Sequence, residues 1–164
     1  MVSPLYAANN MIRRANEQEG VGLTNLKLQK LLYVLYAKYY YETDVSLFPD
    51  RFEAWQYGPV LTKVYDVFKL EGPNPITDMR PDPNGKVMVI SEAGHFGECF
   101  DYIWSSYAHK PASYLVGLTH GKENPGYETA WRRAVTSNGG GYGAFIKDED
   151  IKEDGEKWFA GGSK

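Results

Sequence analysis

The segment from Leu23 to Tyr41 constrains the fold more than any other part of the chain. Its leucines and tyrosines recur at the spacing that places side chains on one face of an α-helix: Leu28, Leu31, Leu32, Leu35, Tyr36 and Tyr39. A second flank is also largely apolar, and Lys27, Lys30 and Lys38 leave only a narrow edge for water. A helix that needs cover on two sides predicts a central helix at about residues 24–42, with other elements packed around it.

The remaining patterns predict shorter elements around this helix. Helical spacing recurs after Ser3-Pro4, after Pro59 and between Phe96 and Tyr107. Two short β-prone segments, at about residues 52–57 and 86–90, are predicted to form a hairpin or short sheet. The predicted fold class is therefore mainly α, a compact helical bundle around the central helix with a small β element.

Length and composition predict one globular domain over residues 1–160 and a frayed tail at 161–164. The net charge of −3 argues against a protein that holds nucleic acid through a broad basic surface. The N-terminus lacks the basic stretch before an apolar run that marks a signal peptide, and no apolar run is long enough to span a bilayer. We therefore expect a cytoplasmic protein without membrane partners.

Residues that could bind a cofactor or perform catalysis lack the spacing that such sites need. The glycine-rich run at residues 139–143 has neither a strong preceding strand nor the Lys of a phosphate loop, so it is predicted to be flexible. His95 and Cys99 are spaced like two metal ligands on one helix face, but Cys99 falls in an apolar stripe and has no second Cys nearby. We predict no cofactor, no metal site and no catalytic residue.

Two polar residues each allow two interpretations. His120 follows a short predicted helix, where it could act as a catalytic base or could fix the loop by hydrogen bonding to a buried carbonyl or a Trp N–H. Gln29 lies among leucines, either on an exposed polar edge or bonded to the segment Trp55–Tyr57. The second interpretation of Gln29 predicts that the strand and the central helix are locked together.

Three stretches taken together resemble the Panacea domain family, also described as SocA-like or phage-associated GepA-like. They are residues 23–33, residues 52–60 followed by Val64 and Tyr65, and Leu118-Thr-His120 with Pro125 and Trp131. The third stretch departs from the family pattern, since Gly126-Tyr127 follows Pro125 where the family has Trp. The resemblance marks ten positions as structural or partner-binding: Leu28, Gln29, Lys30, Trp55, Tyr57, Gly58, Pro59, Tyr65, His120 and Trp131.

The resemblance also implies a function without catalysis. It implies an antitoxin of a bacterial or prophage toxin–antitoxin system, which neutralises a toxin encoded by an adjacent gene through direct binding. The acidic segment at residues 148–156 is a candidate contact for a basic toxin. One branch of the family implies an alternative, a proteolytic adaptor that delivers its partner to a Clp-type protease. A further alternative is a small enzyme with a pocket near Trp55, Tyr57 and His120.

Overall fold

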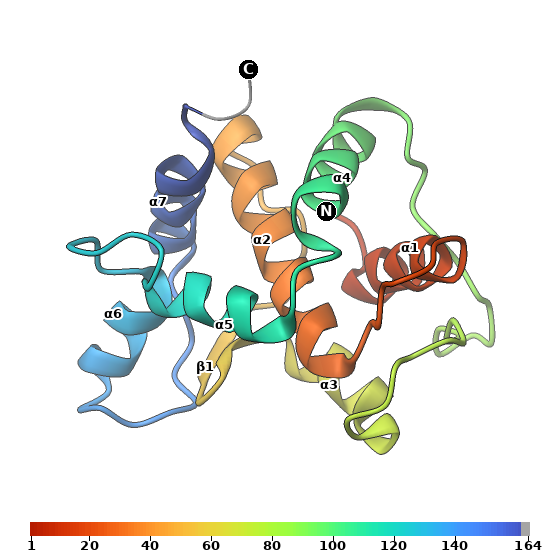
Figure 1. Ribbon diagram of the computed structural model, residues 1–164, viewed down its shortest axis with the longest axis horizontal. Helices are drawn as coiled ribbons and strands as arrows, with labels where there is room; N and C mark the ends of the chain where they lie inside the picture. Colours follow the sequence, from red (N-terminus) through yellow and green to blue (C-terminus); the bar gives the residue numbers. More distant parts are fainter. Residues whose placement is uncertain (162–164) are drawn as a thin grey trace.

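The computed structural model describes residues 1–161, and helix α2 (Asn25–Thr43) occupies its centre (Figure 1). Two helices flank α2 on opposite sides in this view, α4 (Gly94–Tyr107) and α7 (Asp148–Phe159), and α5 (Ala112–His120) crosses the lower part of the bundle. The other elements are α1 (Pro4–Asn16), β1 (Glu53–Trp55), β2 (Gly58–Val60), α3 (Thr62–Phe68), a 3₁₀ turn (Lys69–Glu71) and α6 (Ala130–Ser137). Residues 162–164 of the predicted tail lie outside the described residues.

The central helix and the mainly α fold class are confirmed. Thr24 caps α2, because its hydroxyl accepts a hydrogen bond from the Lys27 backbone N–H at 3.2 Å. Helix α2 contacts elements on both of its apolar flanks: α1, α3, α4, α5, α7 and β2. In the described part of the chain, no helix combines the length and the apolar character that a membrane span requires.

The lysines of α2 do not form the narrow exposed edge that the sequence predicts. Lys27, Lys30 and Lys38 are only 5%, 0% and 3% exposed. Lys38 bonds to Glu42 one turn later, and its ammonium lies 4.3 Å from the centre of the Tyr102 ring. Long aliphatic stems let lysines pack within apolar surroundings when the ammonium finds a partner, so the helix is buried almost all round over its first three turns and beyond.

The small sheet is present, but its strands differ from those predicted. β1 and β2 pair antiparallel around the two-residue turn Gln56-Tyr57, with Ala54 opposite Pro59. Thus the segment predicted as one strand at about residues 52–57 contains β1 and the turn. The Gly58-Pro59 pair, which the sequence suggests as a break, opens the partner strand. Residues 144–146 add a backbone connection on the other side of β1, where Ala54 N–H donates to Ala144 O at 2.8 Å.

The predicted strand at residues 86–90 is wrong, because two asparagines of α1 take up its backbone hydrogen bonds. The Asn9 amide donates to the carbonyls of Arg80 and Met88 at 3.0 and 2.9 Å. The Asn10 side chain bonds to both the N–H and the C=O of Ile90, each at 2.8 Å. Both asparagines are fully buried, so this extended segment is held on α1 by side chains rather than by a second strand.

Candidate functional site

Residues from all three sequence motifs meet around the β1–β2 hairpin. They come from α2, the hairpin itself, α3, the last residue of α5 and the first turn of α6. We call this group the hairpin cluster: Gln29, Lys30, Trp55, Tyr57, Gly58, Pro59, Tyr65, His120 and Trp131. Leu28, the remaining motif residue, is fully buried and belongs to the hydrophobic core.

Lys30 and Gly58 form the closest contact between α2 and the hairpin. The Lys30 ammonium nitrogen donates to the carbonyl oxygen of Pro59 at 2.8 Å, and the whole side chain is buried. Gly58 has a φ of +108°, and a Cβ there would lie 2.7 Å from Lys30 Cε and 2.8 Å from the hydroxyl oxygen of Thr119. Only glycine suits this position. Burial also lowers the pKa of Lys30 to about 7, because the charged form is desolvated.

Gln29 anchors the chain where it leaves the hairpin. Its side-chain oxygen accepts from the backbone N–H of Leu61 at 3.0 Å, and its amide nitrogen donates to the Asn25 side-chain oxygen at 3.0 Å. Gln29 is 1% exposed, which rules out the exposed-edge interpretation. Gln29 therefore ties the central helix to the hairpin region, as its second interpretation predicts. Its bond reaches Leu61, just after β2, and not the segment Trp55–Tyr57.

Trp131 and His120 close the other side of the hairpin. The Trp131 indole N–H donates to the carbonyl oxygen of Trp55 at 2.7 Å, and the His120 ring lies 3.8 Å from the Trp131 ring between centres. Burial, followed by the charges of Arg132 and Lys30, lowers the pKa of His120 to about 4. At neutral pH His120 is therefore uncharged. The Trp131 N–H donates to the Trp55 backbone, so it does not bond to His120. The packing of His120 on the Trp131 ring fits a residue that holds the hairpin in place rather than a catalytic base.

A cavity of about 490 Å³ opens beside the hairpin on the side of α2 and α3. Six of the residues that line it are Leu26, Gln29, Lys30, Trp55, Tyr57 and Tyr65. The Trp55 and Tyr65 rings meet edge to face, with 4.9 Å between their centres. Tyr57 stands at the tip of the hairpin and is 60% exposed. His120 is not among the described residues that line this cavity, although it lies against the hairpin, with a hydrogen bond to the backbone of Gln56.

Two sequence expectations change at the third motif. His120 is the last residue of α5 and does not follow that helix in a loop. Tyr127, which stands where the family has Trp, does not join the hairpin cluster by a hydrogen bond, because its hydroxyl donates to Asp154 at 2.7 Å. Within this motif Trp131, rather than Tyr127, donates a hydrogen bond to the hairpin. No local pattern could have shown this, since Trp131 and Trp55 are far apart in the chain.

Comparison with known proteins agrees with these motifs. Residues 28–125 match the family described as Antitoxin SocA-like, Panacea domain. The chain belongs to this family. Antitoxin SocA of Caulobacter vibrioides (strain NA1000 / CB15N) is 30% identical to it over 142 residues, which cover 81% of this chain and 72% of that protein. No solved structure matches the chain. All residues of the hairpin cluster except Trp131 lie inside the matched range.

Proposed function

We propose that this member of the SocA-like Panacea family is a cytoplasmic antitoxin that neutralises a partner toxin by direct protein binding, and that the hairpin cluster contacts the toxin. Family membership supports the antitoxin role, and a toxin partner follows from it. The observation that carries the choice of surface is Tyr57, an exposed aromatic residue on a rigidly held hairpin beside a cavity. Aromatic residues at the edge of a preformed cavity are typical of binding hot spots.

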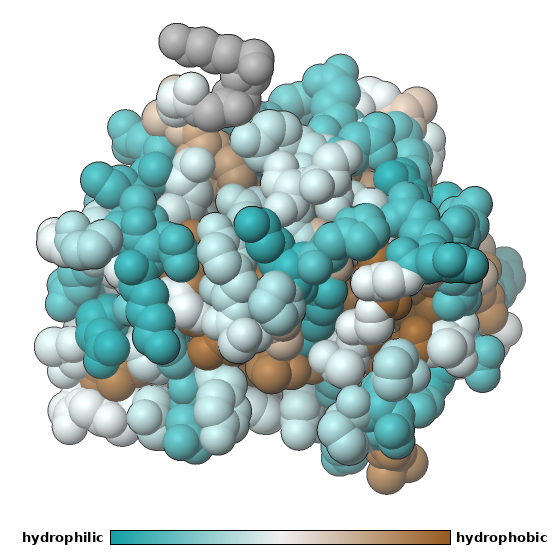
Figure 2. Space-filling view, viewed as in Figure 1, coloured by the Kyte–Doolittle hydropathy of each residue, from teal (hydrophilic) through white to brown (hydrophobic). Residues whose placement is uncertain are grey.

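The hairpin is held in place before any partner arrives. Lys30, Gln29 and Trp131 each bond to the backbone of the hairpin or of its flanking residues, from two different helices. A surface that is already ordered loses little conformational entropy on binding. Two more apolar side chains at or next to this cavity are exposed: Leu26, which lines it, is 38% exposed, and Leu70, which follows the lining residue Lys69, is 96% exposed. In Figure 2 hydrophobic atoms protrude at the lower edge of the view, over the turn that follows α3.

The acidic segment at residues 148–156 supports a toxin contact less well. Asp154 is fully buried, and Asp150 and Glu153 both pair with Arg133, at 3.0 and 2.7 Å. Asp148 accepts from the Tyr36 hydroxyl at 3.1 Å. Most of these carboxylates therefore serve the packing of α7 and its neighbours. We propose the hairpin cluster, rather than this segment, as the principal contact.

Co-expression with the product of the adjacent gene in a bacterial host tests the function. We expect the neighbour to arrest growth when expressed alone and this protein to restore growth. Binding of purified proteins by calorimetry then tests the surface. Tyr57→Ala should weaken binding by about tenfold or more, as a hot-spot residue does. The same substitution should change the free energy of unfolding by no more than about 0.5 kcal/mol, because Tyr57 is exposed.

Tyr142→Ala is the matched control, because Tyr142 is 55% exposed and lies outside the hairpin cluster. It should bind like the wild-type protein. A neighbour that is harmless, or that stays toxic beside this protein, would refute the antitoxin role. Equal binding by Tyr57→Ala and wild type would refute the surface alone and leave the role standing.

The two alternative functions, a proteolytic adaptor and an enzyme, each require something that masking of the toxin by direct binding does not. A proteolytic adaptor requires the toxin to be degraded, so growth rescue in a host that lacks Clp proteases would exclude it. An enzyme working near Trp55, Tyr57 and His120 is supported less, because His120 does not line the cavity and the Lys30 ammonium is committed to the Pro59 carbonyl. Masking needs neither a protease nor a reactive group.

A further inference from the structure

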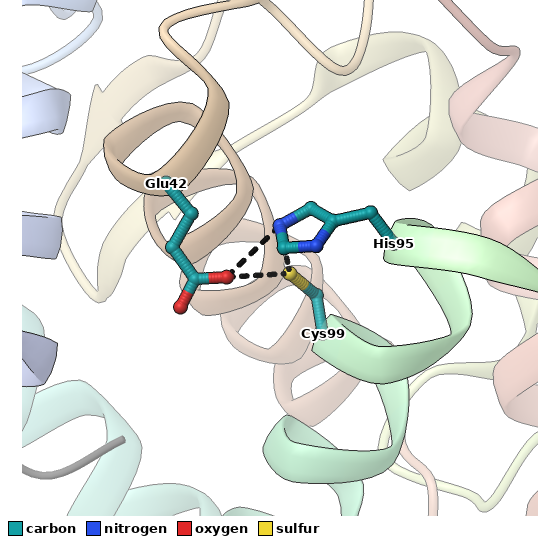
Figure 3. Close-up of side chains that lie close together, drawn as sticks. All are labelled: Glu42, His95 and Cys99. Carbon is teal, nitrogen blue, oxygen red and sulfur yellow. Dashed lines mark hydrogen bonds and ion pairs between the residues drawn. The ribbon is translucent and has the colours of Figure 1, made fainter. Parts of the chain in front are cut away.

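Three potential metal ligands meet between the C-terminal end of α2 and the N-terminal end of α4 (Figure 3). Glu42 comes from the last turn of α2, and His95 and Cys99 lie one turn apart at the beginning of α4. Glu42 Oε1 is 3.0 Å from His95 Nε2 and 3.3 Å from Cys99 Sγ, and the latter two atoms are 3.5 Å apart. The sequence pairs only His95 with Cys99. The third ligand is brought in by the packing of two helices.

These distances fit one face of a zinc coordination tetrahedron. Zinc bonds of about 2.0–2.3 Å to nitrogen, oxygen and sulfur at tetrahedral angles place neighbouring ligand atoms about 3.4–3.6 Å apart. The observed separations of 3.0–3.5 Å need to open by only a few tenths of an ångström. Such a shift is small for Glu42 and His95, since both end in flexible, partly exposed side chains.

Two neighbouring side chains orient the atoms of Glu42 and His95 that would bind a cation. Lys38 pairs with Glu42 Oε2 at 2.5 Å, which leaves Oε1 turned toward His95 and Cys99. The Glu98 carboxylate lies 3.5 Å from His95 Nδ1, so Nε2 is the nitrogen free to bind a metal. A carboxylate behind a ligating histidine is the usual arrangement in zinc sites, because it orients the ring and raises its basicity.

The site is closed on one side and open to water on the other. Cys99 is fully buried, while the side chains of Glu42 and His95 are 20% and 41% exposed. A cation can therefore arrive past Glu42 and His95, and a water molecule can complete its coordination. Burial and the Glu42 carboxylate raise the pKa of the Cys99 thiol to about 12, so its proton must leave to solvent when a cation binds.

We propose that Glu42, His95 and Cys99 bind one zinc ion with a water molecule as fourth ligand, and that this ion ties α2 to α4. A thiolate among the ligands favours zinc over magnesium or calcium. The site does not depend on the proposed antitoxin function. Glu42 lies twelve residues beyond Lys30 on α2, about 18 Å along the helix axis, so the ion does not touch the hairpin cluster.

Cobalt substitution tests this site directly in full-length, tag-free protein stripped of metal. We expect one equivalent of Co²⁺ to produce a thiolate-to-metal charge-transfer band and the strong visible bands of tetrahedral cobalt, and one equivalent of Zn²⁺ to abolish both. Zinc should also raise the thermal midpoint, and a chelator should reverse the rise. Glu98→Gln should weaken zinc binding by about tenfold or more, because it removes the partner of a ligating histidine.

Variants of the ligands separate this site from chance binding. Cys99→Ser should lose the charge-transfer band, and His95→Gln should weaken zinc affinity more than Glu98→Gln does. Since Cys99 is buried, His95→Gln decides the matter if Cys99→Ser does not fold. His109→Gln removes an exposed histidine outside the cluster and should bind zinc like wild type. The proposal is overturned if the charge-transfer band is absent from the wild type or survives in Cys99→Ser, or if His95→Gln and His109→Gln bind zinc equally.

Discussion

The two polar centres that contact α2 differ in how far their side chains are exposed to solvent. Where α7 meets α2, the buried Asp154 carboxylate accepts hydrogen bonds from the Tyr33 and Tyr127 hydroxyls and from the Ala130 backbone N–H, at 2.6, 2.7 and 3.0 Å. In the hairpin cluster, by contrast, Tyr57 is 60% exposed. Among the described residues each region also holds one buried nitrogen without a partner, His120 Nε2 at the hairpin and Trp158 Nε1 in α7. A buried polar group with all its partners specifies a fold, whereas an exposed aromatic side chain remains available to a partner.

The backbones of α7 and of the β1–β2 hairpin approach α2 in different ways. At α7 the approach is direct, since a Cβ on Gly155 would lie 2.2 Å from the carbonyl oxygen of Ala37. At the hairpin the approach is made through a side chain, because Lys30 fills the space over Gly58. The α7 contact is therefore a close helix pair. The hairpin, also held by Gln29 and Trp131, packs on α2 through a lysine whose charge changes near neutral pH. Three substitutions test this difference.

The largest effect is expected at the α7 contact. Asp154→Ala leaves two tyrosine hydroxyls and one backbone N–H buried without an acceptor, and should lower the free energy of unfolding by about 4 kcal/mol. Urea denaturation followed by tryptophan fluorescence measures this change. Glu153→Ala, at an exposed neighbouring carboxylate, should cost less than about 1 kcal/mol. Similar values for the two variants would show that the Asp154 network contributes no more than a surface ion pair.

An intermediate effect is expected at Gly58. Gly58→Ala adds a Cβ that meets Lys30 and Thr119, and Gly85→Ala is its control because Gly85 also has a positive φ, +81°, with open space around it. Both substitutions incur backbone strain, but only the first also overpacks its surroundings, so Gly58→Ala should be about 2 kcal/mol more destabilising. The same denaturation experiment measures the difference. Equal losses would mean that Lys30 moves aside at no cost.

An effect of similar size, spread over about two pH units, is expected from the titration of Lys30. The pKa of Lys30 is about 7 in the folded protein and about 10.4 in the unfolded chain, so the unfolded state binds more protons between these values. The free energy of unfolding should therefore rise by about 2 kcal/mol between about pH 7 and pH 9 through this residue. Lys30→Met should lose that part of the rise. A parallel pH profile in both proteins would show that the Lys30 ammonium stays charged.

Much of the fold could be predicted because it depends on local spacing. The central helix and the helix after Ser3-Pro4 follow from residues within a few turns of one another. The strand predicted at residues 86–90 failed for a non-local reason, since Asn9 and Asn10 on a helix many residues away hold its backbone. Similarly, the lysines of α2 resemble surface residues until the positions of their partners are known.

For the candidate sites, too, some features follow from the sequence and others only from the tertiary structure. The amino-acid sequence by itself determined the family and marked the residues of the hairpin cluster, because these motifs can be read from residue types and their order along the chain. Only the tertiary structure decided that Lys30 lies beneath Gly58, that His120 does not line the cavity, and that Glu42 completes a cluster with His95 and Cys99. Periodicity shows which side of a helix is buried, but the partner of a buried polar group is set by how distant elements pack.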